Sequence, residues 1–302
     1  MSYALRSLRS AGFVLGLIGL LALAETARAT TISYGVLTGP KITYGSASGP
    51  VSESDTPGPG PYFGAPLTPP GSDLLSFNPA GFAVSLSSPT TGTLSKDGDL
   101  SVPLIQTNNS ASGITSLTLT AENGRYMVGG PANTSLAKVT LVISPLLITG
   151  VNGSAIGTPI AVIPTLSFNY LPATGVPLVN ITTNSSSLGA TGSIRFISSG
   201  DEQPLDVDEG LWSASATFDI AGALSAAGLS GKVTQLQSFA LDNTTTVTTV
   251  AGGSAYIDKK QLFLTPNIQD PTVPEPGTFV LGAMGGIAMV MAGWRNRSRE
   301  IG

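Results

Sequence analysis

The chain of 302 residues contains no cysteine and no histidine. Without cysteine it has no disulfides, no thiol catalysis and no thiolate metal sites. Without histidine it has no Ser-His-Asp triad, no imidazole zinc ligand and no histidine general base. We therefore expect a domain held together by burial alone, whose only routes to enzyme chemistry are carboxylates or a serine–lysine pair.

Charge and aromatic side chains are also scarce. Charged residues make up 11% of the chain and aromatic residues 6%, whereas about 25% charged residues is typical of globular proteins. Residues 30–273 hold 8 basic and 15 acidic side chains, a net charge of −7. A charge-poor, acidic surface has little attraction for phosphate backbones, which argues against nucleic acid as a partner.

The N-terminus has the layout of a secretory signal. Arg6 and Arg9 precede an uncharged apolar stretch over 11–24, and Ala27 and Ala29 place small residues where signal peptidase needs them. This order predicts a signal peptide over 1–29 that is cleaved before Thr30. A retained anchor is the alternative, but the stretch is shorter than the roughly 20 residues of a spanning helix.

A second apolar run, residues 279–294, lies near the C-terminus and is followed by arginines in the tail 295–302. Its 16 residues make a helix of about 24 Å, just short of the ~30 Å hydrocarbon core, so it spans marginally. The positive-inside rule keeps this tail in the cytoplasm. The two ends together predict an exported middle and a single pass through the inner membrane. The arginines are Arg295, Arg297 and Arg299.

Directly before this run stand Val273, Pro274, Glu275 and Pro276. The motif, the short glycine-containing helix and the arginine tail together resemble the PEP-CTERM sorting segment of exported bacterial proteins. The resemblance implies recognition of 273–276 by an exosortase-type membrane enzyme, in a setting of exopolysaccharide, and release to the cell surface or extracellular matrix. It covers about the last thirty residues and implies nothing about the fold or activity of the rest.

Between the two ends, turn signals and short β-type runs predict an all-β chain. Residues 30–49 contain two similar segments, Ile32–Gly35 and Ile42–Gly45, around Gly39-Pro40, which indicates a β-hairpin. Residues 50–72 hold seven prolines at 50–70 and are expected to form a linker. The main domain is predicted over 73–266 and the sorting segment over 267–302.

Within 73–266 the expected strands are short and separated by turns. Strict alternation from Trp212 to Ile220 predicts one buried and one solvent-facing side, and 221–227 is the one helix expected there. The pattern favours an antiparallel β-sandwich of jelly-roll or Ig-like type. The expected strands are 101–105, 116–120, 137–143, 160–170, 178–183, 193–198, 212–220, 233–242, 244–250, 254–258 and 261–264, and the expected turns are 96–99, 123–124, 129–131 and 152–153.

One acidic segment is a candidate calcium site. Oxygen ligands suit Ca²⁺, and five carboxylates lie close together in the sequence, but their spacing is not that of an EF-hand and a solvated acidic loop is the favoured alternative. Asp97 and Asp99 are further candidate ligands that a hairpin turn explains fully. Lys259-Lys260 is expected to be an edge-strand or turn charge that discourages aggregation, with a catalytic pair as the less favoured alternative. The five carboxylates are Asp201, Glu202, Asp206, Asp208 and Glu209.

Three functions remain open for the middle of the chain. The favoured one is a structural or interaction role at the cell surface, with no catalysis and no cofactor. The second is a module that binds extracellular polysaccharide through Trp212, Tyr170 or Tyr126 as sugar-stacking groups, although core packing is the better interpretation of Trp212. The third is a glycoside hydrolase, which needs two carboxylates about 5–9.5 Å apart in a groove, and no spacing in the sequence singles out such a pair.

Overall fold

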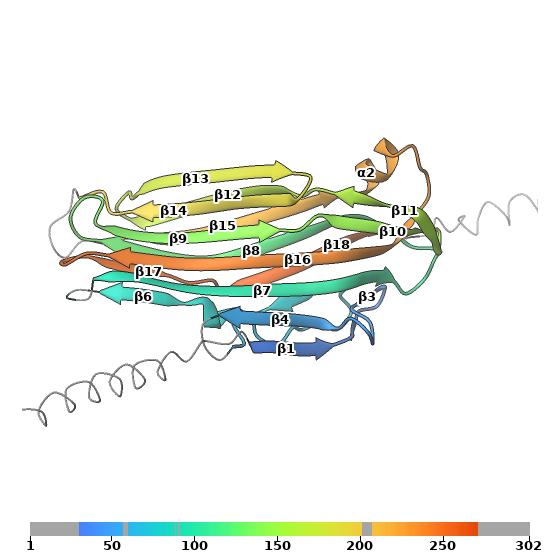
Figure 1. Cartoon of the computed structure of the whole chain (residues 1–302), viewed down its shortest axis with the longest axis horizontal. Helices are drawn as coiled ribbons and strands as arrows, with labels where there is room; N and C mark the ends of the chain where they lie inside the picture. The colour runs from blue at the N-terminus through green and yellow to red at the C-terminus, as the bar shows by residue number, and fades with distance from the viewer. Residues whose placement is uncertain (1–29, 57–59, 88, 90, 201–206, 271–302) are drawn as a thin grey trace, which may run out of the picture. The chain divides into compact units, whose positions relative to one another are not determined.

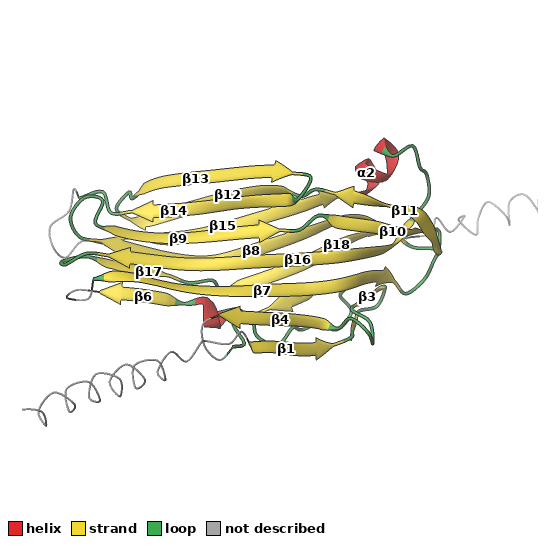
Figure 2. Ribbon diagram, viewed as in Figure 1, coloured by secondary structure: helices red, strands yellow, loops and turns green. Residues whose placement is uncertain are grey.

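The computed structural model describes residues 30–56, 60–87, 89, 91–200 and 207–270. These residues form two antiparallel sheets packed face to face, confirming the all-β sandwich (Figures 1 and 2). Their compact unit ends at Ile268, and the second unit is Gln269–Gly302. The signal peptide, the sorting motif and the apolar run 279–294 lie outside the described residues.

Sheet A contains eleven of the described strands and sheet B seven. Sheet A consists of β1 (Thr30–Gly35), β2 (Leu37–Thr38), β3 (Ile42–Tyr44), β4 (Val51–Thr56), β7 (Gly92–Thr107), β9 (Ser135–Ile143), β10 (Leu146–Val151), β11 (Ser154–Val162), β13 (Leu178–Ser186), β14 (Gly189–Ile197) and β16 (Val233–Thr249). Sheet B consists of β5 (Leu75–Phe77), β6 (Val84–Ser87), β8 (Gly113–Gly129), β12 (Thr165–Thr174), β15 (Val207–Asp219), β17 (Ser254–Ile257) and β18 (Gln261–Gln269).

The main path of sheet A runs β1-β4-β7-β16-β9-β14-β13, and that of sheet B runs β12-β15-β8-β17-β6. The longest strands are central in both sheets. In sheet A, β16 pairs with β7 and β9 on its two sides, and in sheet B, β8 pairs with β15 and β17. The predicted strands 233–242 and 244–250 are therefore one strand, β16.

Side chains that alternate along each strand fill the space between the sheets. On β15, Trp212, Ala214 and Phe218 are buried while their neighbours face solvent, which confirms the predicted alternation. Phe218 packs edge-on against Phe239 of β16, with ring centroids 6.1 Å apart. Burying a large apolar side chain stabilises the fold by about 1.5–3 kcal/mol, so this shared core can hold the sheets together.

Two predicted turns are strand instead. Residues 96–99 lie inside β7, paired with β4 on one side and β16 on the other. Asn123-Gly124 lies inside β8, where the register with β15 shifts between Trp212–Gly124 and Ala214–Ala121. Asn123 takes a positive φ of 55° at this irregularity. An Asn-Gly pair provides the same left-handed conformation for a β-bulge as for a hairpin, and sequence alone does not separate them.

The turns predicted at 129–131 and 152–153 are confirmed. Asn152 and Gly153 have φ of 50° and 78° and connect β10 to β11, as a tight Asn-Gly hairpin requires. The predicted helix is confirmed as α2 (Ile220–Ala226), whose N-terminus is capped by Asp219 accepting a bond from the Gly222 amide at 2.9 Å.

The N-terminal part is more integrated than predicted. The segment Ile32–Gly35 lies in β1, which pairs with β4, whereas β3 pairs with the short β2 and with β7. A hairpin around Gly39-Pro40 is therefore present, but its strands are β2 and β3, and the segment Ile32–Gly35 pairs with β4 instead. The predicted linker 50–72 is wrong over Val51–Thr56, because this segment forms β4 inside sheet A. Its inward positions include Glu53 and Asp55, and charges on a buried face conceal the strand from sequence patterns.

Candidate functional site

The outer face of sheet B carries three adjoining hollows. The largest, about 420 Å³, lies over β12, β15 and β8. A second of about 230 Å³ shares Leu211 with it, and a third of about 410 Å³ toward β18 and β5 shares Asn123. We call this run of hollows the sheet B furrow. The polar lining of its largest hollow comprises Thr120, Glu122, Asn123, Asn169, Ser213 and Ser215.

Strand register sorts the furrow's side chains into rows by chemistry. Ser215 lies opposite Thr120, and Asn169 opposite Ser213, which gives rows of hydroxyl and amide groups. Leu171 lies opposite Leu211, and these leucines are 66% and 40% exposed, an apolar step beside the polar rows. Groups of this kind can donate to and accept from hydroxyls while an apolar face packs beside them.

Beyond the leucines the furrow becomes charged. Arg125 lies opposite Leu211, and Glu209 lies opposite Met127. The furrow's two glutamates, Glu122 and Glu209, line separate hollows.

Of the three predicted stacking residues, one is accessible. Trp212 is 2% exposed and forms part of the core. Tyr126 is 1% exposed, and its ring stacks on Phe196 at 3.7 Å with an interplanar angle of 3°. Burial, followed by the negative charge of Asp208, raises the pKa of Tyr126 to about 12. Tyr170, at the edge strand β12, is 40% exposed and meets Phe196 edge-on.

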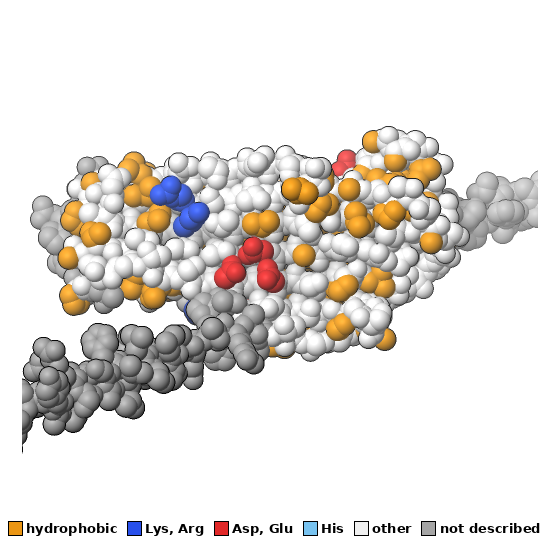
Figure 3. Space-filling model, in the orientation of Figure 1, with side chains coloured by type: hydrophobic (Ala, Val, Ile, Leu, Met, Phe, Trp, Pro, Cys, Tyr) orange, Lys and Arg blue, Asp and Glu red, His pale blue; other side chains and the backbone are white. Residues whose placement is uncertain are grey.

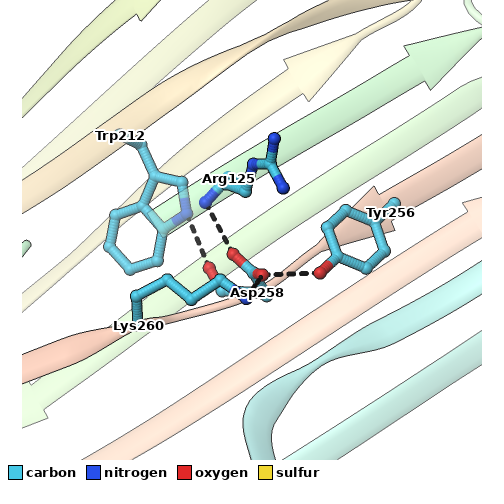
Figure 4. Close-up of polar contacts among 5 residues, drawn as sticks. All are labelled: Arg125, Trp212, Tyr256, Asp258 and Lys260. Atoms are coloured by element: carbon cyan, nitrogen blue, oxygen red, sulfur yellow. Dashed lines mark hydrogen bonds and ion pairs between the residues drawn. The ribbon is translucent and has the colours of Figure 1, made fainter. Parts of the chain in front are cut away.

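Asp258 contacts four residues that line the furrow, Arg125, Trp212, Tyr256 and Lys260 (Figure 4). Its carboxylate accepts from the Arg125 amide at 2.7 Å and from the Tyr256 hydroxyl at 2.5 Å, and it forms an ion pair with Lys260 at 2.8 Å. Its backbone oxygen accepts from the Trp212 indole at 3.0 Å. Burial and the bond to Asp258 raise the pKa of Tyr256 to about 12. Asp258 thus ties the backbone of β8 to side chains of β15 and β17.

A group of carboxylates lies on the outer face of sheet A, over β7 and β16 (Figure 3). Asp99 lies directly opposite Asp242, and Asp97 accepts from Thr244 at 2.6 Å. Burial, followed by the charge of Asp97, raises the pKa of Asp242 to about 6. In the part of the chain that the structure describes, no cluster of three or more acidic side chains has metal-binding geometry.

The candidate calcium segment is described only in part. Asp208 is 1% exposed and accepts from Ser199 at 3.3 Å, whereas the adjacent Glu209 is exposed on the opposite face of β15. Asp201, Glu202 and Asp206 lie outside the described residues. Successive strand residues point to opposite faces. The carboxylates of Asp208 and Glu209 therefore lie on opposite faces of β15 and do not face a common ion.

A buried polar cluster escaped the sequence analysis. Lys259, expected at the surface, is completely buried, and its ammonium nitrogen donates to Asn243 at 2.9 Å. Asp55 and Glu53 are buried on the same side of sheet A. Tyr34 donates to Glu53 at 2.6 Å. Gly98 gave no signal for it, because 96–99 was predicted as a turn, and only its position inside β7 makes it a glycine in a strand, which often marks a close approach.

The sorting residues Val273, Pro274, Glu275 and Pro276, the arginines and the signal-peptidase positions all lie outside the described residues. Within 30–270, apart from the gaps, no helix has the length and apolar character needed to cross a membrane.

No protein-family model and no curated protein matches the chain. Among solved structures, similarity is found to a loop-swap mutant of Necallimastix patriciarum Xyn11A, at 13% identity and a TM-score of 0.20, covering 79% of this chain and 100% of the other. The VP2 subviral particle of infectious bursal disease virus matches at 14% identity and a TM-score of 0.16, covering 80% of this chain and 58% of VP2. At these TM-scores the overlap identifies neither a family nor an activity.

Proposed function

We propose that this protein is an exported, C-terminally sorted component of the bacterial cell surface or extracellular matrix, with a structural or interaction role and no catalysis. In this proposal an exosortase-type enzyme acts at 273–276 after signal peptidase has removed 1–29. The middle of the chain is then a β-sandwich of jelly-roll or Ig-like type displayed outside the inner membrane.

The observation that carries the proposal is the agreement of the two chain ends. Arg6 and Arg9 precede one apolar run, and three arginines follow the other. Both charge patterns place the intervening residues on the same, outer side of the membrane. The sandwich supports the same view, because it builds a large core without cysteine and presents long, polar outer faces.

The test is mass spectrometry of both chain ends in protein recovered from the envelope of a bacterium that has an exosortase. We expect an N-terminus at Thr30 and loss of the segment that follows the motif. Glu275→Ala should retain residues 277–302 and stay in the membrane fraction, whereas Glu202→Ala, a carboxylate outside the motif, should be processed normally. A cytosolic product with Met1 intact overturns the proposal.

A second candidate is binding of extracellular polysaccharide in the sheet B furrow. It is favoured by the paired rows of Asn169–Ser213 and Ser215–Thr120 beside the exposed Leu171 and Leu211. Sugar rings present hydroxyls at their edges and apolar C–H faces, which such rows match. Tyr170 does not contribute its ring to these rows, because it lies opposite the inward Trp212 and meets Phe196 of sheet A on the inner side of β12.

Glycan-array binding tests this candidate. If a glycan binds, Asn169→Ala should weaken the affinity about tenfold, roughly 1.4 kcal/mol. The matched control is Asn180→Ala, which removes an exposed amide from β13 of the other sheet. An equal effect of both variants, or no bound glycan, rejects the furrow as a polysaccharide site.

A further inference from the structure

Lys259 is an isolated amine in the core. It lies in the connection between β17 and β18, and its side chain enters the space between the sheets. Its nitrogen is 5.6 Å from the ring centroid of Phe82 and 5.8 Å from that of Phe63. No carboxylate among the described residues forms an ion pair with it. Burial lowers the pKa of Lys259 to about 7, so a large fraction of this side chain is the neutral, nucleophilic amine at neutral pH.

The one polar group that Lys259 contacts is the side-chain amide of Asn243 on β16. Lys259 Nζ donates to Asn243 Oδ1 at 2.9 Å. The amide nitrogen Nδ2 is buried and has no hydrogen-bond partner among the described residues. Because Cγ is bonded to Oδ1, a small movement of Nζ brings it to the reacting separation of about 3–3.5 Å from this carbon.

The carboxyl of Asp55 lies on the same buried face of sheet A as this amide, with Gly98 between them. Asp55 of β4, Gly98 of β7 and Asn243 of β16 are register partners in three adjacent strands. Gly98 has no side chain to fill the space between its neighbours. A Cβ at this position would lie 2.9 Å from Asp55 Oδ1 and 2.8 Å from the Phe82 ring, so both groups occupy the space above the glycine. Asp55 Oδ1 is itself without a partner among the described residues.

Glu53 can carry a proton near neutral pH. Glu53 lies two residues before Asp55 on the same buried face, and the charge of Asp55 acts on it. Burial raises the pKa of Glu53 to about 7. A protonated carboxyl can donate to an amide as it is attacked, and can take up and return a proton during the reaction.

We propose that Lys259 and Asn243 form an intramolecular isopeptide bond. The neutral Nζ of Lys259 attacks Cγ of Asn243, the Cγ–Nδ2 bond breaks, and the new Nζ–Cγ amide forms. The proton that Nζ loses passes to the departing nitrogen, which leaves as ammonia, and the Asp55–Glu53 pair relays it and is regenerated. No oxidant or co-reactant is required, and the reaction does not depend on export.

The bond joins β16 of sheet A to the β17–β18 connection of sheet B. It therefore ties the two layers of the sandwich together covalently, as an inter-sheet disulfide does in other exported domains. It also removes a buried amine and an unpaired buried amide together. A cysteine-free chain gains from it a link that reducing agents do not break.

The experiment is peptide mapping of the protein purified from cells that express the full chain. Residues 233–258 contain no lysine or arginine, and trypsin does not cleave after an acylated lysine. We expect a peptide spanning 233–260, lighter than its sequence by one ammonia. Chymotrypsin cleaves after Tyr256, and its two products are expected to stay joined.

Controls separate the bond from other losses of ammonia. A succinimide at an asparagine has the same mass change, but it leaves Lys259 open to trypsin and lets the chymotryptic products separate. Lys259→Met and Asn243→Ala should each give the unbonded mass. Asp55→Asn should leave the circular dichroism spectrum intact and leave most of the peptide unbonded, and full bonding in this variant refutes the role of the carboxyl pair. Wild-type protein in which trypsin cleaves at Lys259 and Asn243 is unmodified overturns the proposal, even where a variant fails to fold.

Discussion

Replacing Lys259 with methionine tests whether the core amine is bonded or free, because the two states predict opposite changes in stability. Methionine has a similar length, is apolar and packs readily against Phe63 and Phe82. It cannot form the bond to Asn243. The perturbation therefore removes either a covalent link or a buried titratable amine.

If the bond is present, its loss frees a loop of about 15 residues between Asn243 and Lys259, a change worth about 3 kcal/mol by loop-closure entropy. With about 2–4 °C per kcal/mol for a domain of this size, the melting temperature should fall by about 6–12 °C. If the amine is free, its pKa is lowered to about 7. Keeping it uncharged at pH 7 then costs on the order of 4 kcal/mol, so methionine stabilises the protein.

The assay is urea unfolding at pH 7.5 and pH 9.5, followed by the fluorescence of the buried Trp212. A free Lys259, with its pKa lowered on folding, makes the native state bind fewer protons than the unfolded chain, so stability rises with pH between about 7 and 10.5. An amide does not titrate, and the bonded protein should show no such rise. We expect wild type to be more stable than Lys259→Met at both pH values. A variant as stable as wild type or more so, with wild type gaining stability at pH 9.5, refutes the reasoning.

Four other predictions concern the rest of the sandwich. Asp242→Asn should raise stability by about 1 kcal/mol at pH 7, after allowance for solvent screening, because burial, followed by the charge of Asp97, raises the pKa of Asp242 and makes its ionised form unfavourable. This gain should vanish toward pH 4, where the carboxyl is protonated, and thermal melts at both pH values check it. Gly124→Ala should destabilise by about 3 kcal/mol or more, since its Cβ would lie 2.3 Å from the Trp212 ring, whereas Gly157→Ala meets no atom within 4 Å and should be close to neutral in urea unfolding. Trp212→Phe should cost about 1–3 kcal/mol, because the phenyl ring cannot donate to the backbone oxygen of Asp258; a calorimetric melt unchanged from wild type contradicts this role. Millimolar calcium should leave the melting temperature unchanged, since Asp208 and Glu209 point to opposite faces of β15, and a clear rise supports calcium binding by the acidic segment.

The sequence predicted the sandwich better than its connections. Alternation from Trp212 onward located β15 because one of its faces is uniformly apolar. The same rule missed β4, because Glu53 and Asp55 occupy inward positions there. Asn-Gly at 152–153 is a turn and at 123–124 a bulge, and the difference depends on the partner strand β15, which local sequence does not specify.

For the candidate sites too, the sequence shows the residue types but not which residues become neighbours. The furrow of sheet B takes Asn169 from β12, Ser213 from β15 and Thr120 from β8, which become neighbours only through strand pairing. Tyr170 was identified as a contact residue from its type, and its exposure at the edge strand depends on the order of strands in the sheet. Lys259 was assigned to the surface because lysine is rarely buried without a partner.

By itself, the sequence determined which chemistry is excluded and that the chain is built of strands. It also predicted export and sorting. These properties depend on residue type and on order along the chain, such as the absence of cysteine and histidine, the alternation of β15 and the two apolar ends with their arginines. Only the tertiary structure decided that Lys259, Asn243, Gly98 and Asp55 meet in one buried place. They come from different strands and connections, and the register of β4, β7 and β16 and the packing of one sheet on the other bring them together.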